Sequence, residues 1–153
     1  MASILSPTTF QIKIKEEHVV KGIKTLNETY FTLSNITNVD RRIVTIPQTT
    51  SIDLINVNGI NPGAGTFPSS SMKYVRITNL DLSSSLSVNF TSSDAGDGPS
   101  YWSMKCLPTS SLMFSSPQVT GSIFNGSFGQ DIEFISVYAI SESIDVEYVV
   151  VNG

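Results

Sequence analysis

Short stretches in which apolar and polar residues alternate recur along the whole chain, and this pattern constrains the fold more than any other feature. In the first stretch, Phe10, Ile12 and Ile14 alternate with polar residues. Because successive side chains of a β-strand point to opposite faces, such a stretch predicts a half-buried strand. Further strands bounded by turn residues are predicted at 29–33, 42–46, 51–57, 73–78, 85–90, 101–104, 110–114, 132–139 and 144–151. About ten short strands predict an all-β, antiparallel β-sandwich, with a jelly roll as one candidate topology.

The domain organisation follows from length and from the segments that break the pattern. A chain of 153 residues suits one domain, so residues 10–153 are predicted to form a single β-sandwich. Residues 1–9 contain Pro7 and small polar residues without a period, which predicts a flexible N-terminal arm that orders on contact with a neighbour. Residues 16–26 have some helical spacing, but Val19, Val20 and Gly22 favour a bent strand or a turn. Residues 61–71, with two prolines and two glycines, predict a long loop.

Charge and hydropathy exclude several classes of partner. The net charge is −4, and the nine basic residues are scattered along the chain, so no nucleic-acid-binding surface is predicted. The chain has no apolar run of the roughly 18 residues that span a membrane, and its first residues do not resemble a signal peptide. A single cysteine, Cys106, excludes an intramolecular disulfide and agrees with folding in a reducing compartment. We therefore expect synthesis in a cytoplasm.

The titratable residues predict neither a catalytic residue nor a cofactor. The only histidine, His18, has no nucleophile motif with it, and a surface position is the expected one. One cysteine and one histidine cannot supply the usual ligands of a zinc site. A glycosidase pair would have to come from Asp94, Asp97, Glu133 and Glu147, and their spacing singles out no two of them. The chain is predicted not to be an enzyme.

One acidic segment offers oxygen ligands for a hard cation. Asp94 and Asp97 lie in a glycine-containing stretch, and Asp81 could join them around calcium. The stretch lacks the order of ligands of a known calcium loop, and glycine with aspartate is also typical of a hairpin turn. The turn is favoured, and no metal site is predicted.

Four residues are predicted to contribute to a subunit interface. Tyr101 and Trp102 are adjacent in a predicted strand, so one should face the core and the other should face outward. The outward aromatic residue has three interpretations: a residue at the edge of the core, an interface anchor, or a platform on which a sugar ring stacks. Ile4 and Leu5 are the apolar residues with which the N-terminal arm would reach a neighbouring subunit.

Four segments of the second half have a familiar order. They are 73–81 (KYVRITNLD), 86–90 (LSVNF), 106–114 (CLPTSSLMF) and 146–151 (VEYVVV). In this order they resemble segments of small β-sandwich virion proteins of tailed phages, including phages of marine cyanobacteria. The resemblance covers residues 73–153, and Thr109 departs from it where a turn glycine would be common. It implies a structural role in a phage particle without catalytic residues.

The predicted function is that of a capsid decoration or cement protein. Such a protein would form a homo-oligomer, with a trimer as the expected state, and would bind the major capsid protein or other virion proteins. Its place would be the virion, assembled in the host cytoplasm. The low charge and 40% hydrophobic content leave apolar surface for subunit contacts. The alternatives are a neck, tail or head-fibre component, a carbohydrate-binding receptor-recognition module with Trp102 or Tyr101 as its platform, and, with less support, a glycan hydrolase.

Overall fold

The computed structural model describes residues 8–57, 65–67, 72–92, 100–115 and 132–153, and these residues contain eleven strands and no helix. The strands are β1 (Thr8–Val20), β2 (Ile23–Ile36), β3 (Asn38–Ile46), β4 (Ser51–Val57), β5 (Thr66–Phe67), β6 (Met72–Asn79), β7 (Leu86–Ser92), β8 (Ser100–Cys106), β9 (Ser111–Ser115), β10 (Ile132–Ala139) and β11 (Ile144–Asn152). The predicted all-β class is confirmed.

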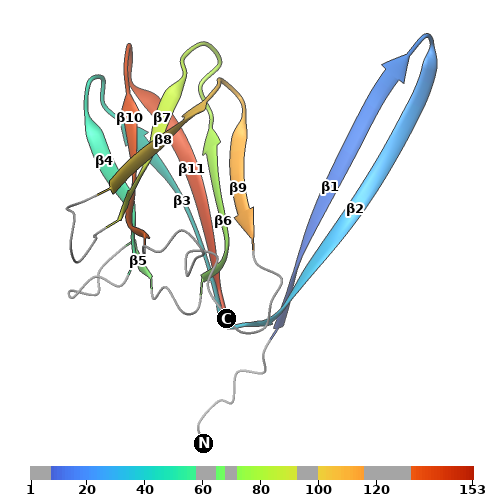
Figure 1. The fold of residues 1–153 in the computed structure, drawn as a ribbon, viewed down its shortest axis with the longest axis horizontal. Helices are drawn as coiled ribbons and strands as arrows, with labels where there is room; N and C mark the ends of the chain where they lie inside the picture. The colour runs from blue at the N-terminus through green and yellow to red at the C-terminus, as the bar shows by residue number, and fades with distance from the viewer. Residues whose placement is uncertain (1–7, 58–64, 68–71, 93–99, 116–131) are drawn as a thin grey trace, which may run out of the picture.

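Nine of these strands form two sheets that pack face to face (Figure 1). One sheet has the order β5-β4-β10-β7-β8, and the other has the order β3-β11-β6-β9. The strands within these sheets pair antiparallel, except for β4 and β5, which are parallel. The predicted antiparallel β-sandwich is therefore confirmed.

The core lies between the two sheets and follows from the alternation within the strands. In β11, Val146, Tyr148 and Val150 point into the core, while Glu147 and Val149 point to the outer face of the four-stranded sheet. Phe90 on β7 is fully buried opposite them. The free Cys106 is also buried, so it is one more small apolar group of the core.

β5 corrects the sequence analysis, which treated residues 61–71 as loop throughout. Thr66 and Phe67 pair with Asn56 and Val57 of β4, and the Asn56 amide donates a hydrogen bond to the Gly65 carbonyl, 2.7 Å away. Phe67 is buried in the core. Burial of this one aromatic side chain draws a short piece of the connection to the edge of the sheet, against the local preference of the surrounding prolines and glycines.

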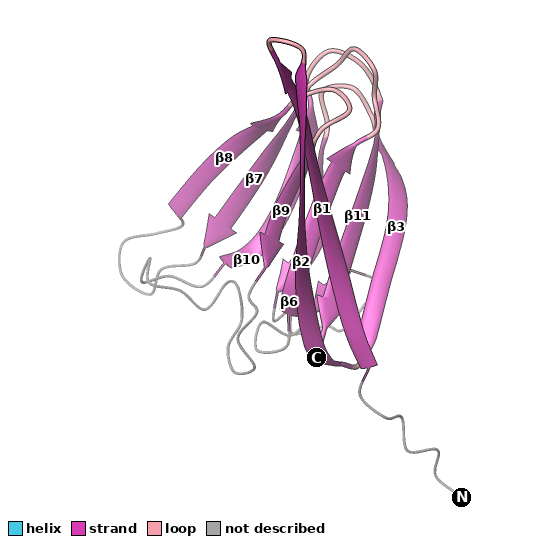
Figure 2. Cartoon of the chain, turned by 90° about the vertical axis from the view of Figure 1, so that its right-hand side faces the viewer, coloured by secondary structure: helices cyan, strands magenta, loops and turns pink. Residues whose placement is uncertain are grey.

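β1 and β2 form a separate two-stranded sheet, a long hairpin that leaves the sandwich at its base and runs beside it (Figures 1 and 2). Its turn is Lys21 and Gly22, with φ of 51° and 80°. Positive φ at both central residues is the geometry of a type I′ turn, which matches the twist of paired strands. Thr8 and Thr9, the last two residues of the predicted arm, belong to β1, while residues 1–7 lie outside the described residues.

Candidate functional site

The base of the hairpin is packed against the outer face of the four-stranded sheet. Leu33 and Ile36 of β2 are buried there with Tyr74, Val149 and Val151. The rings of Phe10 and Tyr74 lie 5.7 Å apart. Two hydrogen bonds join the same region: the Lys73 ammonium donates to the Ser34 carbonyl at 2.9 Å, and the Thr37 amide donates to the Asn152 carbonyl at 2.9 Å. These contacts fix the direction in which the hairpin leaves the body.

The far half of the hairpin is exposed and carries apolar side chains. Val19, Val20, Ile23 and Leu26 are 62%, 58%, 71% and 50% exposed. Val20 pairs with Ile23, and Val19 pairs with Lys24, so the apolar residues lie on both faces of the ribbon. A two-stranded hairpin is marginally stable alone in water, and exposed apolar surface on a projecting element is a candidate contact surface for another molecule. We call these four residues the hairpin tip.

A cleft lies between the hairpin and the outer face of the four-stranded sheet, and Figure 1 shows how the two diverge. Its volume is about 490 Å³. Its apolar lining comes from both walls: Phe10, Ile12, Val39, Tyr74 and Val149. Lys13, Arg41 and Arg76 also line it. Both walls of the cleft therefore carry apolar and cationic side chains.

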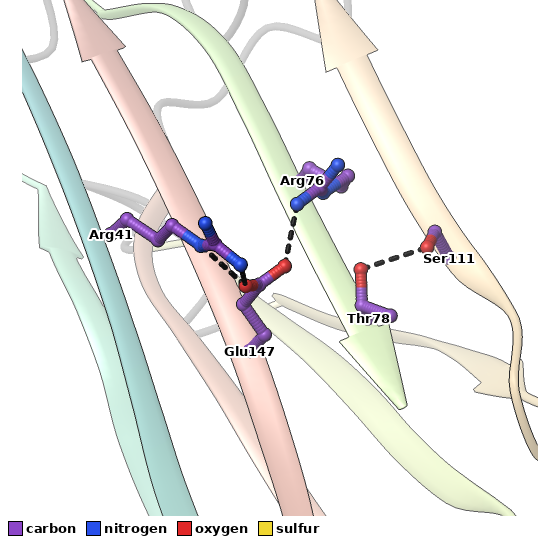
Figure 3. A network of polar contacts seen from close by, with 5 residues as sticks. All are labelled: Arg41, Arg76, Thr78, Ser111 and Glu147. Atoms are coloured by element: carbon purple, nitrogen blue, oxygen red, sulfur yellow. Dashed lines mark hydrogen bonds and ion pairs between the residues drawn. The ribbon is translucent and has the colours of Figure 1, made fainter. Parts of the chain in front are cut away.

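The two arginines of the cleft are held by one carboxylate (Figure 3). Glu147 on β11 accepts a hydrogen bond from Arg41 Nε at 2.5 Å and from Arg76 Nη2 at 2.5 Å. The Glu147 side chain is 7% exposed, against 68% for Arg41 and 33% for Arg76. Because it is paired on both sides, this carboxylate orders the two arginines that line the cleft.

Glu147→Ala is expected to lower the free energy of unfolding by about 2 kcal/mol. Removing one partner of a buried ion pair costs about 3 to 5 kcal/mol, but here both arginines can turn toward water, which reduces the loss. Urea unfolding measures the difference. Ser111→Ala is the control, because it removes an exposed hydroxyl contact to Thr78 on the same face and should cost less than about 0.5 kcal/mol. Equal costs for the two variants would show that the ion pairs do not stabilise the sheet.

Of the four predicted interface residues, only Trp102 has a side chain that the structure describes. Trp102 lies on the edge strand β8 of the five-stranded sheet, directly opposite Phe90, with the two rings stacked 3.8 Å apart. It is 46% exposed, so it covers the edge of the core and still presents surface to solvent. The backbone of Tyr101 belongs to β8, but its side chain, like Ile4 and Leu5, lies outside the described residues. The role of these four residues at an interface stays a prediction.

The candidate catalytic and metal-binding residues that the structure describes lie on different elements: His18 on β1, Asp81 between β6 and β7, Glu133 on β10 and Glu147 on β11. His18 is exposed on the hairpin opposite Thr25, as expected for a surface histidine. Asp94 and Asp97 lie outside the described residues. Within the described ranges, no three His, Cys, Asp or Glu side chains gather where they could hold a metal ion.

Asp81 is used to close the loop between β6 and β7. Its carboxylate accepts hydrogen bonds from the backbone N–H groups of Ser84 at 2.6 Å and Ser83 at 2.7 Å. These bonds hold the pKa of Asp81 below its ordinary value. A lowered pKa stabilises the fold at pH values above the carboxyl's ordinary pKa of about 3.9, and the contribution disappears as the pH falls through the folded-state pKa.

We therefore expect Asp81→Asn to lower the melting temperature at about pH 6, with the difference from the parent protein shrinking toward about pH 3. Thermal unfolding followed by circular dichroism at both pH values measures it. The account of the loop is wrong if the difference is the same at both.

Comparison with models of known protein families gives no match, and comparison with curated proteins gives none either. Among the residues that the structure describes, no helix is long and apolar enough to cross a membrane.

The hairpin tip was missed by the sequence analysis, which described residues 16–26 only as a bent strand or turn. A signal was present. Lys21-Gly22 stands between Val19-Val20 and Ile23, and a glycine turn flanked by β-branched residues is typical of a two-residue hairpin. The sequence could not show that both faces of this hairpin stay exposed, because the exposure depends on where the hairpin lies relative to the two sheets.

Proposed function

We propose that this chain is a non-enzymatic structural subunit of a larger protein assembly. The observation that carries the proposal is the hairpin, which projects from the sandwich with exposed apolar residues on both faces of its tip. An isolated monomer gains nothing from holding these side chains in water, whereas an assembly buries them and recovers hydrophobic free energy. The described residues do not gather into a metal site, and the buried Glu147 is committed to two ion pairs, which also favours a structural role.

We further infer that the sandwich is a jelly roll. If β5 is left out, the other eight strands of the sandwich pair from the outside of the chain inward, the first with the last and the second with the second to last. These pairs are β3 with β11, β4 with β10, β6 with β9, and β7 with β8. This is the pairing of a long folded ribbon that is rolled up so that its pairs alternate between two sheets. Jelly rolls occur in viral capsid proteins and in lectins. The topology supports a role in a particle by analogy of fold only.

The assembly that we propose is a phage particle, with this chain as a decoration or cement protein bound to the major capsid protein. The support is the likeness of residues 73–153 to small virion proteins, together with an assembly surface and a jelly-roll strand order. A place in the neck, tail or head fibre uses the same surface and is the nearest alternative.

Mass spectrometry of purified phage particles whose genome carries this gene tests the proposal. The protein is expected in the particle fraction at a copy number comparable to that of the major capsid protein. A neck, tail or fibre component would be present at a few to some tens of copies. Presence in the infected-cell lysate with absence from the washed particles would contradict a structural role in the virion.

A carbohydrate-binding module is the second candidate, favoured by the surface around Trp102. This residue and Asn89, Thr91, Ser103 and Ser136 line a shallow hollow. The ring of Trp102 stacks on Phe90 at the edge of the core and is still 46% exposed, and an exposed aromatic ring is a surface on which a sugar ring can stack. A glycan array with the parent protein and with Trp102→Ala decides this: binding that the variant loses supports the module, and no glycan signal removes it.

A further inference from the structure

The hairpin tip has two apolar faces that are exposed to water, and the cleft has two walls with apolar side chains. The tip carries Val20 and Ile23 on one face and Val19 and Leu26 on the other, so a flat partner would leave one face in water. The cleft has two walls with apolar side chains on each, namely the outer face of the four-stranded sheet and the hairpin itself. An element that is apolar on both faces is covered best by a groove that is apolar on both walls.

We propose that two copies of this chain exchange hairpins, each hairpin entering the cleft of the other copy with its tip toward the base. This inference rests on the proposed function as an assembly subunit and names the partner of its hairpin. Four layers then follow one another across the interface. They are the four-stranded sheet of the first copy, the hairpin of the second copy, the hairpin of the first copy, and the four-stranded sheet of the second copy. Each face of each hairpin has one neighbour.

Because the hairpin has two faces, the exchange favours a dimer of the chain over a ring of three copies. In a ring of three, each hairpin would contact the sheet and the hairpin of the next copy, whose cleft it enters. It would also contact the hairpin of the previous copy, which enters its own cleft. These are three neighbours, but a two-stranded ribbon has only two faces. A two-fold exchange gives an isologous interface, in which the same surfaces of both copies meet. The proposal therefore replaces the expected trimer by a dimer as the unit of assembly.

The area of such an interface is sufficient for a stable dimer. The exposed end of the hairpin comprises about seven residues of each strand, so it is about 23 Å long and about 10 Å wide. Each of the three layers of contact would bury about 230 Å² on either side, or about 1,400 Å² in total. Specific interfaces bury about 1,200 to 2,000 Å².

Two charged substitutions at the tip test the exchange. Val20→Glu/Ile23→Glu changes residues that are 58% and 71% exposed in the monomer, so the fold should persist. The control is Leu82→Glu, at a residue that is 85% exposed in the β6–β7 loop. Size-exclusion chromatography with light scattering is expected to give twice 16.6 kDa, or about 33 kDa, for the parent protein and the control. The tip variant is expected at the monomer mass, with the dissociation constant raised at least about a hundredfold.

Cross-linking tests the position of the tip. Because Cys106 is the only cysteine and is buried, Ile23→Cys and Val39→Cys each carry one accessible thiol. A short bismaleimide added to an equimolar mixture should join the two variants, since Val39 lines the cleft. A mixture of Leu82→Cys with Val39→Cys should give no such product.

A monomeric parent protein, a tip variant that stays dimeric, or a mixture without the Ile23–Val39 product would each overturn the exchange. These outcomes do not decide the proposed function, which is tested separately by the content of purified particles. A dimer whose tip variant remains dimeric, found in particles, would leave the structural role standing and reject only the hairpin exchange. Absence from particles combined with a tip-dependent dimer would support the hairpin exchange and reject the structural role in the virion.

Discussion

Phe90→Ala is expected to lower the free energy of unfolding by about 4 kcal/mol, the largest effect that we predict for a single substitution. Phe90 is fully buried on β7, stacks on Trp102 with ring centroids 3.8 Å apart, and meets Phe114 of the opposite sheet edge to face at 5.4 Å. Its loss would leave a cavity between the two sheets and would remove the support of the Trp102 ring.

Fluorescence measures this effect directly, because Trp102 is the only tryptophan. Urea unfolding should show a lower midpoint for Phe90→Ala, and emission of the native variant should shift toward longer wavelength as the indole becomes more solvated. Phe90→Leu is the matched control, with an expected cost of about 1.5 kcal/mol or less because most of the volume is retained. A cost for alanine no larger than for leucine would show that the two sheets do not meet at Phe90.

Asn79→Ala is expected to cost about 3 kcal/mol. Asn79 is fully buried at the end of β6, and its amide nitrogen donates to the carbonyls of Ser84 at 2.8 Å, Leu107 at 3.2 Å and Cys106 at 3.4 Å. Its amide oxygen accepts the Asp81 N–H at 3.0 Å. One side chain therefore joins two loops at one end of the sandwich. Alanine would leave buried acceptors without a donor, and each costs about 1 to 3 kcal/mol.

The adjacent residue supplies the control for Asn79. Thr78 lies on the exposed face of β6, where its hydroxyl contacts Ser111 at 2.8 Å, and Thr78→Ala should cost less than about 0.5 kcal/mol. Thermal and urea unfolding of both variants measure the difference. If both substitutions cost the same, the Asn79 side chain does not hold the two loops together.

The strands of the sandwich could be predicted because each satisfies a local rule. β4 and β10 have the predicted bounds, since apolar alternation and flanking turn residues coincide there. β5 could not be predicted, because two residues beside a proline and two glycines carry no period. Phe67 is held there by the core and by pairing with β4, both of which are tertiary contacts.

The pairing partners, and with them the site, were beyond a single sequence. The alternation in β11 places Glu147 on one face, but that Arg41 and Arg76 flank it depends on the register of three strands that are distant in the chain. In the same way, β1 reads as one more half-buried strand. Only the structure shows that its partner is β2 alone and that both faces of their far end remain exposed.

Hydrogen–deuterium exchange of the hairpin at low and high protein concentration tests most directly that the tip is covered by another subunit. At about 0.1 µM, where the monomer should predominate, the amides of residues 16–27 should exchange within seconds, because a two-stranded end without tertiary cover opens readily. At about 100 µM they should become at least tenfold slower, while the amides of β6 and β11 remain unchanged. Exchange of residues 16–27 that is equally fast at both concentrations would contradict the account.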